Sequence, residues 1–210
     1  MTWQTDLYDE MVADVVTYTN RRDQVGEIEI AMRTATQNAH LVDMFFRDKV
    51  TTQVQLPNGS VQFAIDIPTM LPGLRGLVDI RPCDLNGNVL YTDTFSNSSP
   101  IEIVENNDIY DPQYGNVKPN IAYVSGSNLI IRYPISIGGF IVEYARAPQT
   151  RRELYNSWIA QEVPAIITFW ASAIIFSTNG NQEKAQSLLK QIQDFFIPQL
   201  KQNYLLAKMR

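Results

Sequence analysis

The sequence is short of the residues that most reaction chemistry needs. Among 210 residues it has one cysteine, Cys83, and one histidine, His40. One thiol and one imidazole cannot complete a zinc or iron-sulfur site, and a lone thiol cannot form a disulfide within the chain. A Ser-His-Asp or Cys-His relay also needs an imidazole beside its nucleophile, for which His40 is the single source. We therefore expect a protein that is not an enzyme, with no metal, no cofactor and no catalytic residue.

Signals for membranes, secretion and nucleotides are also missing. The most apolar stretch, 163–176, is shorter than the roughly 20 residues that span a bilayer, which predicts no membrane span. Residues 1–6 carry no basic residue and lead to no apolar segment, so the sequence predicts neither a secretion signal nor a transit peptide, and synthesis in the cytoplasm. Neither glycine pattern that cradles phosphate, Gly-x-x-x-x-Gly-Lys or Gly-x-Gly-x-x-Gly, is present.

Charge changes sign along the chain. Residues 1–47 and 48–148 each carry a net charge of −4, from 4 basic and 8 acidic residues and from 6 and 10, whereas residues 149–210 carry +3, from 7 and 4. Proteins that wrap DNA neutralise several phosphates with lysine and arginine. Most of this chain has the wrong sign for that, so we expect no specific DNA binding.

The composition is that of a folded protein, since 45% of residues are apolar and 19% charged. Glycine and proline concentrate in the middle: 8 of 10 glycines and 9 of 11 prolines lie in 48–148. The predicted fold is α+β: N- and C-terminal helices form a helical bundle around a central inserted antiparallel β-sheet or small barrel of about six strands. The predicted domains are an N-terminal helical hairpin at 1–47, the inserted β region at 48–148, and C-terminal helices with a basic tail at 149–210.

Two helices are predicted at the N-terminal end. The first begins at Thr5, and the second runs from about residue 24 to 45. Apolar residues at helical spacing mark the buried faces that we expect. These are Leu7, Met11, Val15 and Tyr18 in the first helix, and Ile28, Met32, Ala35, Ala39 and Val42 in the second.

The middle of the chain has the alternation of strands. Val61, Phe63, Ile65 and Ile67 alternate with more polar residues, which predicts a half-buried strand. Hairpins are expected at Asn58-Gly59 and Asn86-Gly87, because both residues of this pair accept a positive φ, and a third at 125–128. A further strand is expected at 140–144.

The C-terminal segment is predicted to be helical again. Ser157 is a plausible N-cap, Pro164 suits a first helical turn, and Asn179-Gly180 ends a helix that is apolar nearly all round. Such a helix needs neighbours on every side, so we expect Ile166, Trp170 and Ile174 to take part in subunit packing. A last helix begins near Gln182, and Pro198 is expected to bend or break it. Its expected buried face is Ala185, Leu188, Leu189, Ile192, Phe195, Phe196 and Leu200.

Several residues could form a reactive site, but each has a simpler interpretation. His40 has Asp43 three residues on, which resembles a base with its orienting carboxylate. A histidine near a helix C-terminus is more often a packing residue. Cys83 has only Arg81 near it in sequence to lower its pKa, which favours a structural thiol. Acidic pairs such as Asp9 with Glu10, or Asp108 with Asp111, fit a glycosidase, although 22 acids make chance pairs common.

The C-terminal tail is basic and apolar, with no acid after Pro198. Its residues fit a helix end whose lysines complement the dipole, or a tail that leaves its subunit and docks in a partner's groove. Both interpretations stay open. The expected partner-binding residues are Lys201, Tyr204, Leu205, Leu206, Lys208 and Arg210.

Three segments together resemble a known family. They are Thr19-Asn20-Arg21; Glu29, Ala31, Arg33, Ala35-Thr36, Ala39-His40, Asp43 and Phe46; and Ser157-Trp158-Ile159-Ala160 with Pro164. With these residues the chain resembles the head-to-tail adaptor, or tail-completion ring, proteins of tailed bacteriophages, especially short-tailed ones.

The resemblance implies a structural protein of the virion at the head-tail junction, made in the host cytoplasm. It implies a homo-oligomeric ring, with twelve the expected number of copies, below the portal protein and above a tail tube or nozzle protein. The ring would line the DNA exit channel, through which DNA passes without specific binding, and the C-terminal tail would contact the portal. An acidic surface suits such a conduit.

Two other functions fit the residues less well. A tail-fibre or receptor-binding module would use the aromatic and polar strand region, and would form a trimer. A hydrolase that uses only carboxylates would need a cleft with two carboxyl groups about 5 to 10 Å apart.

Overall fold

The computed structural model describes residues 3–43, 45–55, 62–90, 101–105, 108–110, 117–133 and 137–208, with the backbone alone for 203–208. The contacts between residues divide the chain into two compact units. One unit comprises Met1–Asp48 with Ala147–Arg210, and the other Lys49–Arg146. We call them the helical unit and the β unit.

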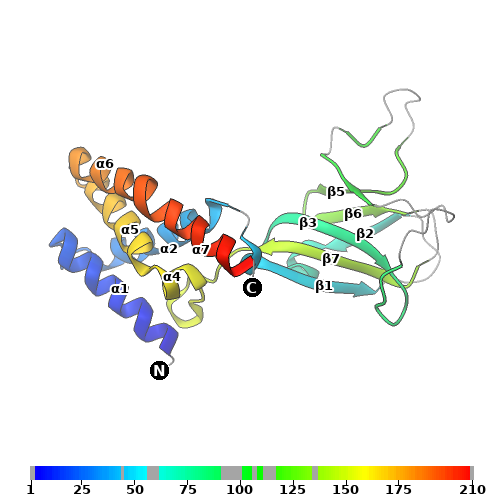
Figure 1. The fold of residues 1–210 in the computed structure, drawn as a ribbon, viewed down its shortest axis with the longest axis horizontal. Helices are drawn as coiled ribbons and strands as arrows, with labels where there is room; N and C mark the ends of the chain where they lie inside the picture. Colours follow the sequence, from blue (N-terminus) through cyan, green and yellow to red (C-terminus); the bar gives the residue numbers. More distant parts are fainter. Residues whose placement is uncertain are drawn as a thin grey trace. The chain divides into compact units, whose positions relative to one another are not determined.

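The helical unit combines elements from both ends of the chain (Figure 1). Its helices are α1 (Trp3–Thr19), α2 (Val25–Leu41), α4 (Trp158–Glu162), α5 (Pro164–Thr178), α6 (Gln182–Gln191) and α7 (Ile197–Lys208), with 3-10 turns at Phe46–Asp48 and Arg152–Leu154 and a π-helical segment at Ile192–Phe196. The apolar helix α5 is central, because it contacts α1, α2, α4 and α6.

The buried face of α1 differs from the predicted one. The buried residues are Tyr8, Met11, Val15 and Thr19, whereas Leu7 is half-buried and the Tyr18 side chain is 53% exposed. Met11 and Val15 are buried as predicted, whereas the prediction was wrong by one residue at each end of the face, where Tyr8 and Thr19 are buried in place of Leu7 and Tyr18. Because apolar residues occupy both sides of α1, the packing against α2 and α5 decides which side is covered.

The other helices follow the predicted spacing more closely. In α2, Ile28, Met32, Ala35 and Ala39 are buried as predicted, but the helix ends at Leu41. Ala185, Leu188, Ile192 and Leu200 are buried in the C-terminal helices, whereas Leu189 and Phe195 are exposed, against prediction.

Three local signals at the helix ends are confirmed, whereas α1 begins at Trp3 and not at the predicted Thr5. The Ser157 hydroxyl accepts from Ala160 N at the start of α4, Pro164 is in the first turn of α5, and Gly180 has a φ of 78° after α5. Pro198 does not break the helix: it lies in the first turn of α7, and the five residues Ile192–Phe196 before α7 are π-helical.

The β unit contains two sheets (Figure 1). The first has the order β1-β7-β3, and both pairs are antiparallel. The second has the order β2-β6-β5-β4, in which β4 and β5 are parallel. The strands are β1 (Lys49–Gln55), β2 (Gln62–Asp66), β3 (Leu74–Cys83), β4 (Glu102–Ile103), β5 (Ile121–Ser125), β6 (Asn128–Arg132) and β7 (Gly139–Arg146), and the short helix α3 (Ile67–Met70) follows β2.

Both sheets contribute to one apolar core. Phe140 of β7 is fully buried, and its ring centroid lies 5.4 Å from Phe63 of β2 and 6.2 Å from Tyr133, which follows β6. Both contacts are edge-to-face, the arrangement that aromatic quadrupoles favour. The aromatic contacts therefore join side chains from the two sheets.

The predicted fold class was wrong. The described strands form two sheets of three and four strands, without closing into a barrel, and β4–β5 is a parallel pair. The helices are not confined to a bundle of the two ends either, because α3 lies between two strands. Alternation predicts which side of a strand is buried but not which strand pairs with it, so it did not reveal the division into two sheets.

Single predictions within the β unit have different outcomes. Phe63 and Ile65 are buried in β2 as predicted, whereas Ile67 begins α3. The hairpin at 125–128 joins β5 to β6, and the predicted strand at 140–144 is part of β7. The turn near Asn86-Gly87 runs from Asp84 to Gly87, with Gly87 N donating to Asp84 O at 3.1 Å, and of the predicted pair only Gly87 has a positive φ, of 83°. The pair Asn58-Gly59 and Val61 lie outside the described residues.

Candidate functional site

Four side chains form a hydrogen-bonded group inside the helical unit, which we call the His40 cluster: His40, Asp48, Ser157 and Trp158. His40 Nδ1 lies 2.8 Å from Asp48 Oδ1, and Nε2 lies 2.9 Å from Ser157 Oγ. Trp158 Nε1 donates to the same Asp48 oxygen at 2.8 Å. His40, Ser157 and Asp48 are 2%, 2% and 6% exposed, so these three side chains are closed to solvent, whereas Trp158 is half-buried.

Both ring nitrogens of His40 have a partner in the cluster. Nδ1 is paired with the Asp48 carboxylate, and Nε2 with the Ser157 hydroxyl, which can either donate or accept. The Ser157 oxygen is still able to accept from Ala160 N, which caps α4. Every one of these bonds is compatible with the others, so the cluster joins α2, α4 and the segment before β1.

Aromatic side chains surround the cluster. The Trp158 ring packs edge-on against His40 and Phe45, at centroid distances of 5.9 and 5.1 Å. Nearby, the Tyr155 hydroxyl lies 3.0 Å from Thr36 Oγ1, and burial raises the pKa of Tyr155 to about 12. Tyr155 therefore stays neutral over the whole physiological pH range.

Ser157, His40 and Asp48 have the order of contacts found in serine hydrolases, in which a carboxylate orients the imidazole that serves as base. Here the serine is buried and caps a helix, so substrate has no access to Oγ in this conformation. We therefore interpret the cluster as a structural element that fixes how the helices pack.

The carboxylate beside His40 is not the predicted one. Asp43 lies instead with its Oδ2 3.8 Å from Lys201 Nζ, and Asp48 takes the place at Nδ1. Asp48 and Ser157 were not recognised as partners of His40, because Ser157 is 117 residues away and no local pattern links them. The one available signal was that His40 and Ser157 both belong to the family resemblance.

The turn between α1 and α2 makes a second group of contacts. Its residues Asn20 and Arg21 belong to the family resemblance. Asn20 has a φ of 54°, and Arg21 donates to Gln24 at 3.2 Å and to Asn179 at 2.9 Å. Gln24 also donates to Asn179 Oδ1 at 3.3 Å. These bonds hold the turn to the C-terminal end of α5.

The other candidate reactive residues have structural partners or are exposed. Burial raises the pKa of the Cys83 thiol, which is fully buried, so the thiolate is disfavoured. Arg152 binds Asp9 through two nitrogens, and these hydrogen bonds lower the pKa of the Asp9 carboxyl. Glu10 and Asp108 are exposed, and Asp111 lies outside the described residues.

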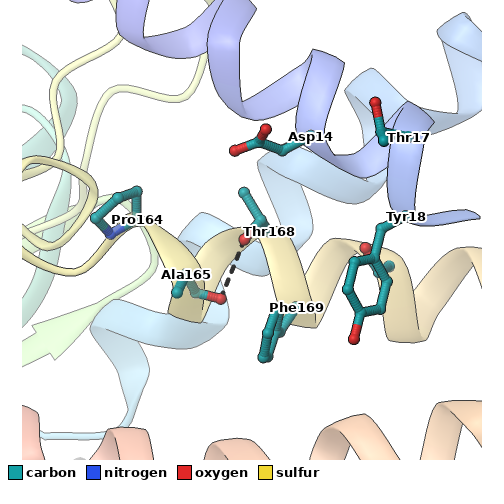
Figure 2. A pocket seen from close by; sticks show the side chains of 8 residues that line it. Asp14, Thr17, Tyr18, Pro164, Ala165, Thr168 and Phe169 are labelled. Carbon is teal, nitrogen blue, oxygen red and sulfur yellow. Dashed lines mark hydrogen bonds between the residues drawn. The ribbon is translucent and has the colours of Figure 1, made fainter.

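A cavity of about 350 Å³ lies between α1 and the N-terminal half of α5. We call it the α1–α5 groove. Figure 2 shows side chains that line it, with a hydrogen bond from Thr168 Oγ1 to Ala165 O at 3.2 Å. The residues that line it are Asp14, Thr17, Tyr18, Pro164, Ala165, Thr168, Phe169 and Ser172.

The three residues predicted to pack between subunits all contribute to the helical unit's own core. Ile166 is 1% exposed, whereas Trp170 and Ile174 are partly buried and pack at the edge of that core. Ile166 is therefore covered by its own subunit. Trp170 and Ile174 keep some exposed surface.

The predicted docking residues lie in α7 or beyond it. Lys201 is exposed, and the helical backbone continues through positions 204, 205, 206 and 208. Arg210 lies outside the described residues. Asp43 pairs with Lys201 at the start of this segment.

Within the described ranges, no group of three His, Cys, Asp or Glu side chains is placed to hold a metal ion. None of the described helices is long and apolar enough to cross a membrane. In comparisons with known proteins, no family model and no curated protein matches the chain.

Proposed function

We propose that this protein is a structural head-to-tail adaptor of a bacteriophage virion. In this proposal, copies of the chain form a ring below the portal, connect the capsid to the tail and line the channel through which DNA leaves. The expected number of copies is twelve. The C-terminal residues from Lys201 to Arg210, which we call the docking segment, attach each copy to a partner, and the resemblance implies the portal.

The exposed apolar surface of the helical unit carries this proposal. After its own core is formed, nine large apolar side chains in the described part of the unit remain between 37% and 70% exposed. Isolated exposed apolar residues are common, but many on one small unit favour burial against other subunits. They are Trp3, Tyr18, Val25, Ile30, Leu41, Phe46, Leu154, Leu189 and Phe195.

The His40 cluster gives further support. His40 and Ser157, from two of the segments that carry the resemblance, are in direct contact, and Ala35, Ala39 and Ala160 share their core. These residues shape the helices and are closed to solvent. This is what a ring subunit without reaction chemistry needs, because its function depends on a defined shape.

A density map of the particle neck tests the proposal directly. We expect a ring of identical chains between the portal and the tail. The mass of the native oligomer on the portal distinguishes such a ring from the trimer that a tail-fibre or receptor-binding module would form. A trimer with outward-facing sheets would contradict the proposal.

A deletion tests the docking segment. Removal of residues 201–210 should leave the subunit folded and abolish its attachment to DNA-filled heads, because the apolar and basic anchors are lost. The exposed lysine Lys190 of α6 offers a control, since Lys190→Ala removes a positive charge outside the segment and should leave attachment unchanged. Attachment of the deletion variant at the normal level would contradict this part of the proposal.

No observation favours the hydrolase that uses only carboxylates. Of the two acidic pairs, Asp9 is ion-paired with Arg152, and the low pKa of its carboxyl makes it a poor proton donor at neutral pH. Turnover of a cell-wall sugar by the purified chain would revive this alternative.

A further inference from the structure

We propose that the α1–α5 groove is a binding site for a small ammonium compound, a molecule that joins a positively charged amino group to a broad apolar body such as a ring. This inference is independent of the proposed function, since one copy of the helical unit contains every residue that lines the groove. The volume of about 350 Å³ is at the small end of the range of about 300 to 1,000 Å³ that is typical of ligand pockets.

Two aromatic side chains give the groove an apolar wall. The ring centroids of Tyr18 and Phe169 lie 5.4 Å apart. Phe169 also packs edge-to-face against Phe196, at a centroid distance of 5.4 Å, so its ring is held from two sides. Tyr18 is still 53% exposed. A ligand with an apolar body would cover the exposed ring, which is favourable because apolar surface is removed from water.

Asp14 brings a negative charge to the same side of the groove. It lies four residues before Tyr18 on α1, so the two side chains are neighbours on the helix surface. Figure 2 shows the Asp14 carboxylate above Thr168, and the Tyr18 ring beside Phe169. A carboxylate one helical turn from an aromatic ring suits an ammonium group, because the carboxylate accepts its hydrogen bonds and the ring face attracts its charge.

The charges of α1 favour a cation over an anion. This helix contains four acidic residues and no basic residue. Asp9 is paired with Arg152. The other three, Asp6, Glu10 and Asp14, have no ion pair in the described part of the chain. The potential at this helix is therefore negative, which attracts a cationic ligand and repels an anionic one.

One polar group that lines the groove lacks a partner. Thr17 Oγ1 donates to Ala13 O at 2.8 Å and Thr168 Oγ1 donates to Ala165 O at 3.2 Å, so both threonine hydroxyls are used within their helices. Ser172 Oγ is buried and has no hydrogen-bond partner among the described residues. A buried hydroxyl without a partner is costly, and a ligand whose polar group reaches Ser172 would relieve this cost.

Other occupants fit these features less well. Water could bind the Ser172 hydroxyl, but it would leave the Tyr18 ring uncovered and the charge of Asp14 without a partner. A lysine of another protein also carries an ammonium group on an apolar stem. Its unbranched chain covers less of the two rings than a broad apolar body does, so we assign the groove to a free ammonium compound.

A matched set of probes tests the charge preference of the groove. 2-Phenylethylammonium, 2-phenylethanol and 3-phenylpropionate share a phenyl ring and differ in the charge of the group attached to it. In ¹H–¹⁵N spectra of the full chain, the ammonium probe should bind about tenfold more tightly than the alcohol, and the carboxylate no more tightly than the alcohol. The amide signals that should shift are those of Thr17, Tyr18, Phe169 and Ser172.

Two variants separate Asp14 from the general charge of α1. Asp14→Asn keeps the size of the side chain and removes its charge, so it should weaken binding of the ammonium probe about tenfold. Binding of the alcohol should be unchanged, which shows that the groove of this variant is intact. Glu10→Gln is the matched control, because it removes an exposed charge of α1 outside the groove and should change the affinity for the ammonium probe less than about twofold.

Four results would overturn the inference. They are equal affinity for the three probes, equal affinity of Asp14→Asn and the unaltered chain for the ammonium probe, shifts only at amides remote from the groove, and binding of Nα-acetyl-lysine methylamide without binding of 2-phenylethylammonium. The last result would assign the groove to a lysine of a partner protein. None of these decides the proposed function, which fails only if the particle neck contains no ring of this chain.

Discussion

The two units stabilise their cores in different ways. Every residue that is both polar and buried in the described structure lies in the helical unit: Thr19, Thr36, His40, Asp48, Ser157, Thr168 and Ser172. The core of the β unit is formed by apolar and aromatic side chains, with Phe140 in contact with Phe63 and Tyr133. In the β unit the backbone ladders already define which strands are neighbours. Helices have no such ladder between them, so side-chain hydrogen bonds help to define their packing.

The largest effect is expected in the aromatic core of the β unit. Phe140→Ala should lower its free energy of unfolding by about 4 kcal/mol, because it removes a fully buried ring and leaves a cavity. Hydrogen exchange of β7 and its partner strands measures the loss. The control Val124→Ala trims an exposed side chain of β5 and should cost less than about 0.5 kcal/mol.

Tryptophan fluorescence separates the two units in the same experiment. All three tryptophans, Trp3, Trp158 and Trp170, belong to the helical unit. An unchanged urea transition of tryptophan fluorescence in Phe140→Ala would show that the helical unit unfolds independently. A shift of the whole transition would show that the two units unfold together, and would remove the distinction between them.

The next largest effect concerns the His40 cluster. His40→Leu should cost about 3 kcal/mol, because the buried Asp48 carboxylate and the Ser157 hydroxyl each lose a hydrogen-bond partner. Urea unfolding followed by tryptophan fluorescence measures this loss. Asp43→Asn changes the exposed carboxylate three residues away and should cost less than about 0.5 kcal/mol. A larger loss for Asp43→Asn than for His40→Leu would mean that the cluster contributes little.

Substitutions of two buried serines should have smaller effects on the free energy of unfolding, and these effects should differ from each other. Ser157→Ala should cost about 1 to 2 kcal/mol, because it removes the cap of α4 and a bond to His40. Ser172→Ala should cost nothing measurable or stabilise the subunit, because Ser172 Oγ has no partner in the described structure. Equal losses in urea unfolding would show that burial alone, and not hydrogen bonding, decides the effect.

The smallest effect is the pH dependence of the ion pair between Asp9 and Arg152. Hydrogen bonds from Arg152 lower the pKa of Asp9 in the folded protein, from an ordinary value of 3.8. The pair therefore stabilises the folded state above about pH 3.8, and this contribution is lost as the pH falls through the lowered folded pKa. Both side chains are more than 40% exposed, so we expect less than about 1 kcal/mol.

Asp9→Asn removes the contribution of this ion pair to the free energy of unfolding. Unfolding curves of the two proteins should differ at neutral pH and converge in acid. A difference that persists at low pH would show that Asp9 acts through packing instead of charge.

Local features of the helices could be predicted because their causes lie within a few residues. The Ser157 cap, the first-turn Pro164 and the positive φ of Gly180 each depend on neighbours at most four positions away. The hairpin between β5 and β6 was found for the same reason. The face of α1 was predicted only at Met11 and Val15, since apolar residues on both sides of this helix leave the choice at its two ends to the packing against α2 and α5. The exposed Tyr18 is a wall of the groove for that reason.

The sequence by itself determined which chemistry is scarce, where α4 and α5 begin and where α5 ends, and that the residues after Pro198 are basic and apolar. Tertiary structure decided that Asp48 and not Asp43 binds His40, that Ser157 completes the cluster from 117 residues away, and that the strands divide into two sheets. The physical reason is the distance along the sequence over which each interaction acts. Capping and turn preferences act over one helical turn, whereas the partner of a buried polar group, or of a strand edge, is whichever segment the rest of the packing brings within about 3 Å.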